Sequence, residues 1–405
     1  LEFDPEVLRR YVNFMNNPDE DPAAEAFGNG DKYFGICTLM ATLPGLPMFG
    51  HGQWEGFREK YGMEFRKPRQ DEAVDPELVA RHDREISPLL HRRSLFAGVE
   101  SFLLYDFFTP EGHVDENVFA FSNGIEDRRA LVLYQNRFAS TRGWIRTSAA
   151  FAVKREGGGT SGLAQRTLGE GLSLTPKEGC FTLFRELSTG LEYIRSSRDL
   201  CDSGFYTDLH AYQCRVFLDV REVQDGEDRG YARLAGELEG RGVPSLEIAL
   251  RELRFRPART AFRDLADPDL FRRILAVRIT LPGGTPDPGL PGEVEGKAHA
   301  LLSVIRQHAG GKGDERRIAG EIRSRVEALL QLPVAGDLPS GSPSPDYSSA
   351  IHDLLSGLER QPSRWGLLLG WLLAEGIEEM RTGGEAERAG RIGIEEWGMD
   401  TVLCD

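Results

Sequence analysis

The first ninety residues alternate helical patterns with short apolar runs that each end in a polar turn. Apolar residues recur at helical spacing over residues 4–12, and a short buried strand that closes in polar residues is expected within residues 13–21. A second helix is predicted over residues 31–42, and a second strand over residues 46–49. A third helix begins at Asp75-Pro76 and continues through residue 90. This order of elements predicts parallel βα units.

Both polar turns follow predicted strands, and βα-barrel enzymes carry their chemistry at the carboxyl ends of strands. Residues 14–19, Phe-Met-Asn-Asn-Pro-Asp, resemble the α-amylase family block in which Asn-His-Asp follows strand seven. Residues 45–53, Gly-Leu-Pro-Met-Phe-Gly-His-Gly-Gln, are similar to the strand-eight block of that family. The resemblance implies an enzyme that acts on α-glucans, in which Asp19 stabilises the transition state. Its candidate substrate-binding residues are Asn17, His51, Gln53 and Trp54.

The sequence departs from the family pattern at three positions. Pro18 stands where the family has a sugar-binding histidine, and proline has no side-chain donor. His51 replaces a tyrosine, and Trp54 replaces an acidic residue. Glycoside cleavage also needs a nucleophile and a general acid, which the resemblance assigns to an Asp and a Glu on strands upstream of this chain. The chain is therefore expected to lack the amino-terminal part of its barrel and to be inactive alone.

Each candidate residue also has a structural interpretation. Residues 17–22, Asn-Pro-Asp-Glu-Asp-Pro, are typical of a turn that precedes a helix. His51 is equally consistent with a structural histidine at a strand end. Trp54 and Phe57 have rings that suit the C–H face of a sugar, and the same rings suit core packing.

The rest of the chain changes pattern twice. Short β-rich runs separated by turn residues fill residues 98–223 and predict an antiparallel β-sandwich after a distal barrel segment at residues 1–97. Helical patterns occupy residues 224–332, a Pro/Ser/Gly linker residues 333–346, and a helical tail residues 347–405. The expected fold is thus the distal part of a (β/α)8 TIM barrel (α/β), then an all-β sandwich, then an α-helical extension. The apolar run at residues 365–373 is too short to span a bilayer and predicts a core helix.

Composition excludes several classes of partner. The net charge of −15 disfavours nucleic acid and anionic membrane surfaces, whereas a neutral glucan is indifferent to it. Five cysteines without metal-ligand spacing predict neither a disulfide framework nor a metal site, and they are typical of a cytoplasmic protein. No cofactor is indicated by any motif.

Three functional hypotheses follow. The chain is the carboxyl-terminal part of an α-amylase-family hydrolase or transglycosylase, with the missing barrel part as its partner. Alternatively, it is a non-catalytic carbohydrate-binding or scaffolding protein with an ancestral barrel remnant. The third hypothesis is a protein-interaction module, which binding by the helical tail would distinguish from the second.

Overall fold

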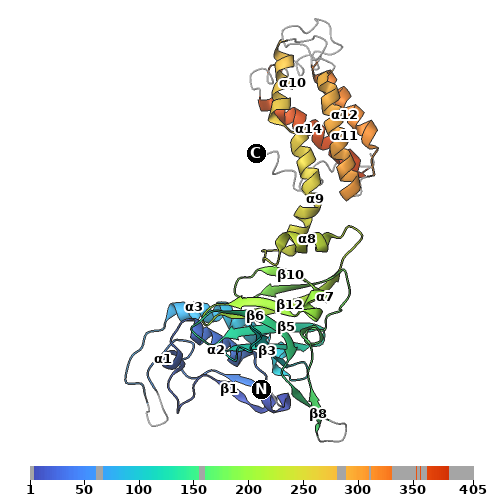
Figure 1. The fold of residues 1–405 in the computed structure, drawn as a ribbon. Coiled ribbons are helices and arrows are strands. Elements are labelled where there is room, and N and C mark those ends of the chain that lie inside the picture. The colour runs from blue at the N-terminus through green and yellow to red at the C-terminus, as the bar shows by residue number, and fades with distance from the viewer. Residues whose placement is uncertain are drawn as a thin grey trace. The chain divides into compact units, whose positions relative to one another are not determined.

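Parallel pairing of two short strands organises the first part of the chain (Figure 1). Strand β1 (Val12–Phe14) pairs with β2 (Leu46–Met48), and helix α2 (Asp31–Thr42) connects them. The connection includes a short helix, α1 (Ala23–Phe27). The parallel βα arrangement predicted from the sequence is therefore confirmed.

This computed structural model describes residues 4–60, 67–154, 160–280, 289–309, 312–330, 353, 356 and 363–382. The chain divides into two compact units, Leu1–Glu247 and Ile248–Asp405. The linker expected at residues 333–346 lies outside the described residues, as does most of the tail expected at residues 347–405.

Three expectations about the first unit are wrong in detail. Strand β1 is not buried, since Val12 and Phe14 are 46% and 45% exposed. Within the described residues its sheet has two strands, so no third strand pairs beside it. The first helix is a 3-10 helix, η1 (Pro5–Arg10), not an α-helix. The third helix divides into α3 (Pro76–Glu85) and α4 (Ser87–His91), because Pro88 lacks the N–H that would continue it.

Eight antiparallel strands form the main sheet of this unit. Their order is β10-β9-β12-β5-β4-β3-β6-β11. A separate hairpin consists of β7 (Phe151–Lys154) and β8 (Thr160–Ala164), and the helices beside the sheet are α5 (Ser94–Ala97), α6 (Leu168–Gly171), α7 (Ser197–Asp202) and α8 (Gly230–Leu238). The strands of the sheet are β3 (Leu103–Phe108), β4 (Val118–Ile125), β5 (Arg128–Gln135), β6 (Thr141–Ser148), β9 (Cys180–Glu186), β10 (Glu192–Ser196), β11 (Phe205–Leu209) and β12 (Cys214–Gln224).

The sheet curls strongly upon itself. Five strands separate β9 from β11 in the sheet, which would place them roughly 29 Å apart if it were flat, at about 4.8 Å per strand. The rings of Phe184 on β9 and Phe205 on β11 nevertheless lie 5.9 Å apart, centroid to centroid. The antiparallel strands agree with the sequence, but one curled sheet replaces the two separate sheets of the expected sandwich.

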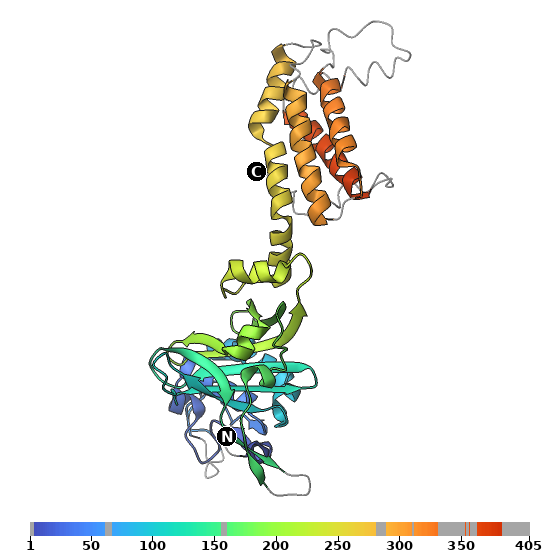
Figure 2. The same cartoon turned by 45° about the vertical axis from the view of Figure 1, so that its right-hand side comes forward.

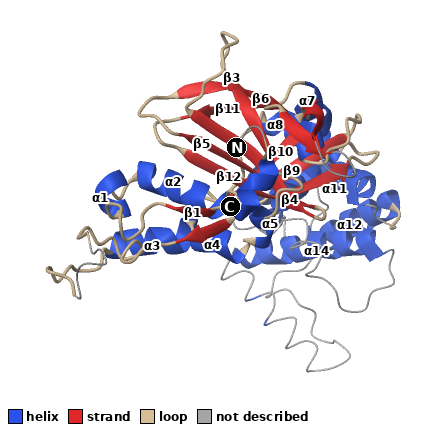
Figure 3. Ribbon diagram, turned by 90° about the horizontal axis from the view of Figure 1, so that it is seen from below, coloured by secondary structure: helices blue, strands red, loops and turns tan. Residues whose placement is uncertain are grey.

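Both faces of the curled sheet are buried at β5. On β5, Leu131 and Leu133 point into the enclosed core, whereas Ala130 and Val132 pack against the helices of the amino-terminal segment. Figure 3 shows these helices, α2 to α4, beside the sheet. The amino-terminal segment and the sheet thus share one continuous core, which fixes the position of the β1–β2 strand ends.

The second unit is a helical bundle (Figure 2). The helical character predicted for residues 224–332 is confirmed in the part of that range that the structure describes. The apolar run of α14 supplies Leu369, Leu372 and Leu373 to buried positions, as predicted. Among the described helices, none combines the length and apolar character needed to cross a membrane. The helices of the bundle are α9 (Leu246–Leu265), α10 (Pro268–Thr280), α11 (Gly289–Ala309), α12 (Glu315–Leu330) and α14 (Ser363–Thr382).

Candidate functional site

The carboxyl ends of β1 and β2 bring the two polar turns of the sequence together. Asn16 follows β1, and Gly50 follows β2. The two residues approach so closely that a Cβ atom added at Gly50 would lie 2.3 Å from Nδ2 of Asn16. A side chain at position 50 would therefore displace the Asn16 side chain.

Asn17 and Asp19 form a tight turn beyond β1. The side-chain oxygen of Asn17 accepts hydrogen bonds from the backbone N–H groups of Asp19, at 2.8 Å, and Glu20, at 3.1 Å. This is the Asx geometry that the structural interpretation predicts. The Asp19 side chain is exposed, and the described residues provide no hydrogen bond or ion pair to its carboxylate. Asn17 therefore holds the backbone of the turn, while the carboxylate of Asp19 is available to a ligand.

Gln53 joins the two turns from inside. It is 1% exposed; its side-chain oxygen accepts from the N–H of Gly50 at 3.0 Å, and its Nε2 lies 3.2 Å from Sδ of Met15. Both ends of the amide are thus engaged within the protein. Gln53 therefore links Met15, which precedes Asn16, to the turn after β2.

The two remaining candidates lie on the same turn. The ring of Trp54 stacks on His82 with centroids 4.5 Å apart and packs edge-on against Phe49 at 5.4 Å. His51 is exposed, and its ring lies 6.2 Å from that of Phe57. Trp54 therefore has the packing role that was its structural interpretation, while His51 lies at the surface.

A buried pair beneath this turn was missed by the sequence analysis. Tyr33 on α2 and His82 on α3 are both fully buried. The Tyr33 hydroxyl lies 2.9 Å from the backbone oxygen of Gln53 and 3.1 Å from Nε2 of His82. Nδ1 of His82 lies 3.0 Å from the carbonyl oxygen of Leu78. Because a carbonyl only accepts, Nδ1 carries a proton, so in the neutral ring Nε2 is an acceptor that competes with the Gln53 carbonyl for the single proton of the Tyr33 hydroxyl.

Burial keeps this pair uncharged. It lowers the pKa of His82, and it raises the pKa of Tyr33 well above its usual value. The neutral pair therefore fixes the Gln53 backbone. No local signal in the sequence could have revealed it, since Tyr33 and His82 are 49 residues apart and belong to different helices.

Arg93 fixes the approach to β2. Its guanidinium donates to the carbonyl oxygen of Ala41 at 2.9 Å and of Leu43 at 2.7 Å, and also to that of Gly45. These carbonyls lie at the end of α2 and in the following turn, where helix geometry leaves acceptors unpaired. Desolvation lowers the pKa of Arg93 to about 10, so it stays charged at neutral pH.

One buried acceptor remains at the strand ends. Asn16 is 5% exposed, and its Oδ1 has no hydrogen-bond partner among the described residues. A search of those residues finds no group of three or more His, Cys, Asp and Glu side chains that could hold a metal ion. The chemical groups that the site offers a ligand are thus carboxylate, amide and imidazole.

Comparison with solved structures finds partial and distant matches to α-amylase-type enzymes. The α-amylase of Geobacillus thermoleovorans complexed with acarbose is 11% identical, with a TM-score of 0.34, over 53% of this chain and 39% of that enzyme. The maltogenic α-amylase AmyB of Thermotoga neapolitana is 13% identical, with a TM-score of 0.34, over 52% of this chain and 42% of that enzyme. The chain thus spans less than half the length of these enzymes. No protein-family model and no curated protein matches it.

Proposed function

We propose that this chain is the carboxyl-terminal part of an α-glucan-acting glycoside hydrolase or transglycosylase, in which Asp19 stabilises the transition state. The observation that supports the proposal is that Asp19, an exposed and unpaired carboxylate among the described residues, lies in the turn that follows β1, one of two parallel strands. In βα-barrel enzymes this edge of the sheet holds the substrate.

Asp19 acts on charge that develops at the sugar. Cleavage of a glycosidic bond passes through a transition state with positive charge on the ring, which a nearby carboxylate stabilises. The rigid Asn17 turn keeps the Asp19 backbone in place, so little reorganisation accompanies the reaction. His51 would contact a sugar hydroxyl from the turn after β2. Gln53 and Trp54 would act indirectly, by holding that turn.

A complementary barrel segment supplies the remaining chemistry in this proposal. The nucleophilic Asp and the acid/base Glu belong, by the family resemblance, to strands that this chain does not contain. The exposed apolar side chains of Val12, Phe14 and Leu46 on β1 and β2 support such a segment, because neighbouring βα units would cover them. We accordingly expect no turnover by this chain alone.

The cytoplasm is the proposed location. The four described cysteines, Cys37, Cys180, Cys201 and Cys214, are free thiols, which supports a reducing compartment. The acidic charge further supports a neutral polysaccharide as substrate over nucleic acid or an anionic membrane.

Amylose turnover tests the assignment of Asp19. Reducing ends and transfer products are measured for the chain alone and for the chain joined to a complementary barrel segment. In the active assembly, Asp19→Asn should lower kcat by about 10²-fold or more, as loss of transition-state stabilisation does. Glu20→Gln is the matched control, since its exposed carboxylate lies one residue further along the same turn.

The outcomes separate catalysis from the alternative. Activity in the assembly that Asp19→Asn leaves unchanged would overturn the role of Asp19. Retention of glucan without turnover in any assembly would instead favour the non-catalytic binding or scaffolding function.

A further inference from the structure

A cavity of about 300 Å³, lined by both polar and apolar residues, lies in the first unit, and none of its lining residues belongs to the Asp19 turn. Its walls come from α2, from α3 and from the loop between β11 and β12. Asp31, Arg81 and Glu85 form one side, and His210, Tyr212 and Gln213 form the other. This volume is at the lower end of the range for small-molecule sites, about 300–1,000 Å³, and suits one or two sugar rings.

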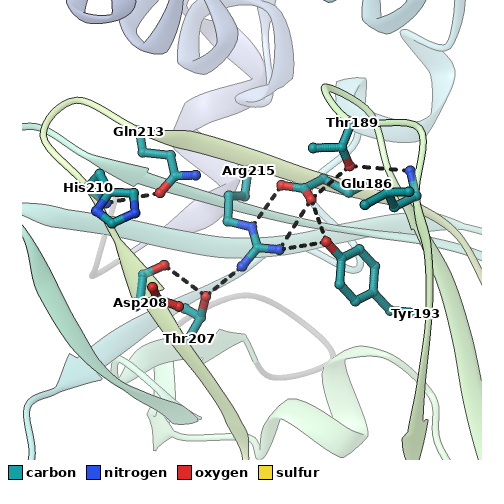
Figure 4. A network of polar contacts seen from close by, with 9 residues as sticks. Glu186, Thr189, Tyr193, Thr207, Asp208, His210, Gln213 and Arg215 are labelled. Atoms are coloured by element: carbon teal, nitrogen blue, oxygen red, sulfur yellow. Dashed lines mark hydrogen bonds and ion pairs between the residues drawn. The ribbon is translucent and has the colours of Figure 1, made fainter. Parts of the chain in front are cut away.

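Tyr212 lies in the loop between β11 and β12 with an unfavourable backbone. Its φ is +54°, in the left-handed region that bulky side chains rarely adopt. The loop is held closed by a hydrogen bond from the N–H of Gln213 to the carbonyl of His210, and by one from the N–H of His210 to the Gln213 side chain (Figure 4). Glycine would fit this backbone without strain, so the backbone conformation does not require the aromatic ring.

Phe138 extends the aromatic surface beside the cavity. It lies between β5 and β6 and is 82% exposed. Its ring centroid is 6.0 Å from that of Tyr212, and the N–H of Tyr212 donates to the carbonyl of Arg137 next to it. Two adjacent loops therefore bring the exposed ring of Phe138 against Tyr212, which lines the cavity.

The charges in the cavity disfavour an anionic ligand. Arg81 pairs with Asp31 at 2.7 Å and with Glu85 at 2.9 Å, and it also lies over the Phe34 ring. One guanidinium is thus shared by two carboxylates, so no excess positive charge attracts an anion. The carboxylate oxygens retain lone pairs that can accept hydrogen bonds from hydroxyl groups.

We propose that this cavity is an accessory binding site for the glucose units of an α-glucan, separate from the Asp19 site. The C–H face of a sugar ring packs on Tyr212 and Phe138, and its hydroxyls donate to Asp31 and Glu85. The proposal rests on the proposed function for its substrate class. It goes further, because it gives this chain a binding activity that needs no other part of a barrel.

Binding of maltoheptaose to the full chain tests the site. Isothermal titration calorimetry measures affinity, and retardation in gels that contain glycogen measures binding to polymer. Tyr212→Gly and Phe138→Ala should each weaken binding at least about fivefold, since each removes an aromatic contact. Tyr206→Ala is the matched control, because Tyr206 is 47% exposed and packs against Trp144, 4.7 Å away, outside the cavity.

Thermal unfolding of the same variants separates binding from structure. Tyr212→Gly should leave the unfolding temperature within about 2 °C of the wild type, because relief of the left-handed strain offsets the lost ring contacts. A Tyr212 that serves only the fold would show the opposite pattern, with a lower unfolding temperature in Tyr212→Gly and unchanged maltoheptaose affinity.

Two further results would overturn the site. One is a wild-type chain that binds no maltoheptaose, and the other is a Tyr206→Ala variant that loses as much affinity as Tyr212→Gly. Neither result bears on Asp19, whose role is tested by turnover. Conversely, Asp19→Asn should leave maltoheptaose binding by the chain unchanged, so the two proposals can fail independently.

Discussion

The buried carboxylate of Glu186 on β9 accepts two hydrogen bonds from the Arg215 guanidinium on β12, at 2.8 and 3.2 Å (Figure 4). The same guanidinium donates to the Thr207 hydroxyl on β11 at 2.9 Å. The Tyr193 hydroxyl on β10 donates to Glu186 at 3.0 Å. The network therefore links strands from opposite ends of the sheet order, and its polar contacts cross the interior of the curl.

Loss of either partner in this pair should destabilise the curled sheet. Burial raises the pKa of Glu186, but the Arg215 guanidinium outweighs this effect and lowers it below the usual value, so the pair is charged at neutral pH. Glu186→Gln or Arg215→Met should each lower the free energy of unfolding by about 3 kcal/mol or more, because an uncompensated buried charge remains. Denaturant unfolding at pH 7 measures this. The variant with both substitutions should lose less free energy of unfolding than the sum of the two single losses. A loss equal to that sum would mean that Glu186 and Arg215 are not coupled.

Arg93 should contribute far more to stability than its neighbour in sequence. Arg93→Met removes three hydrogen bonds to carbonyl groups and should cost about 2–4 kcal/mol, since bonds from charged donors are strong. Arg92→Met is the matched control. Arg92 forms an exposed ion pair with Asp219 at 2.9 Å, and such pairs contribute less than about 1 kcal/mol. Equal losses in the two variants, measured by denaturant unfolding, would contradict the role given to Arg93.

Local patterns in the sequence predict the elements of this fold better than their three-dimensional closure. The βα order of the first ninety residues and the strand runs of the second region follow from periodicity and turn residues. The curl does not, because it depends on contacts such as Phe184 with Phe205, which no local pattern encodes. Similarly, the block at residues 13–21 indicated a buried strand, whereas Phe14 is 45% exposed, because burial depends on neighbouring units that a local window cannot reveal.

The candidate site shows the same division. Its position at two parallel strand ends was predictable, since each polar turn directly follows a strand. The role of each residue within the site was not predictable. Gln53 is engaged by Gly50 and Met15, and Trp54 by His82, through contacts that only the folded chain creates. An amide or a ring at a strand end has the same sequence signature whether it faces a ligand or the core.

His82 should make the protein less stable in mild acid. Burial lowers its pKa in the folded chain, while Asp83, Glu55 and Glu85 act in the opposite direction without reversing the shift. In the unfolded chain the pKa is about 6.5. The unfolded state therefore binds more protons than the folded state as the pH falls through and below that value. The free energy of unfolding should decrease from pH 7.5 to pH 5.5, because the buried site disfavours the charged imidazolium of His82.

Replacement of His82 isolates its contribution. His82→Phe keeps a ring against Trp54 but cannot titrate, so its stability should be lower at pH 7.5 and should change less with pH than that of the wild type. His91→Gln, which removes an exposed histidine from the adjacent helix α4, should retain the wild-type slope. Denaturant unfolding at half-unit pH steps gives each slope. A His82→Phe slope equal to that of the wild type would assign the acid sensitivity to other groups and would remove His82 as the neutral support of the Gln53 turn.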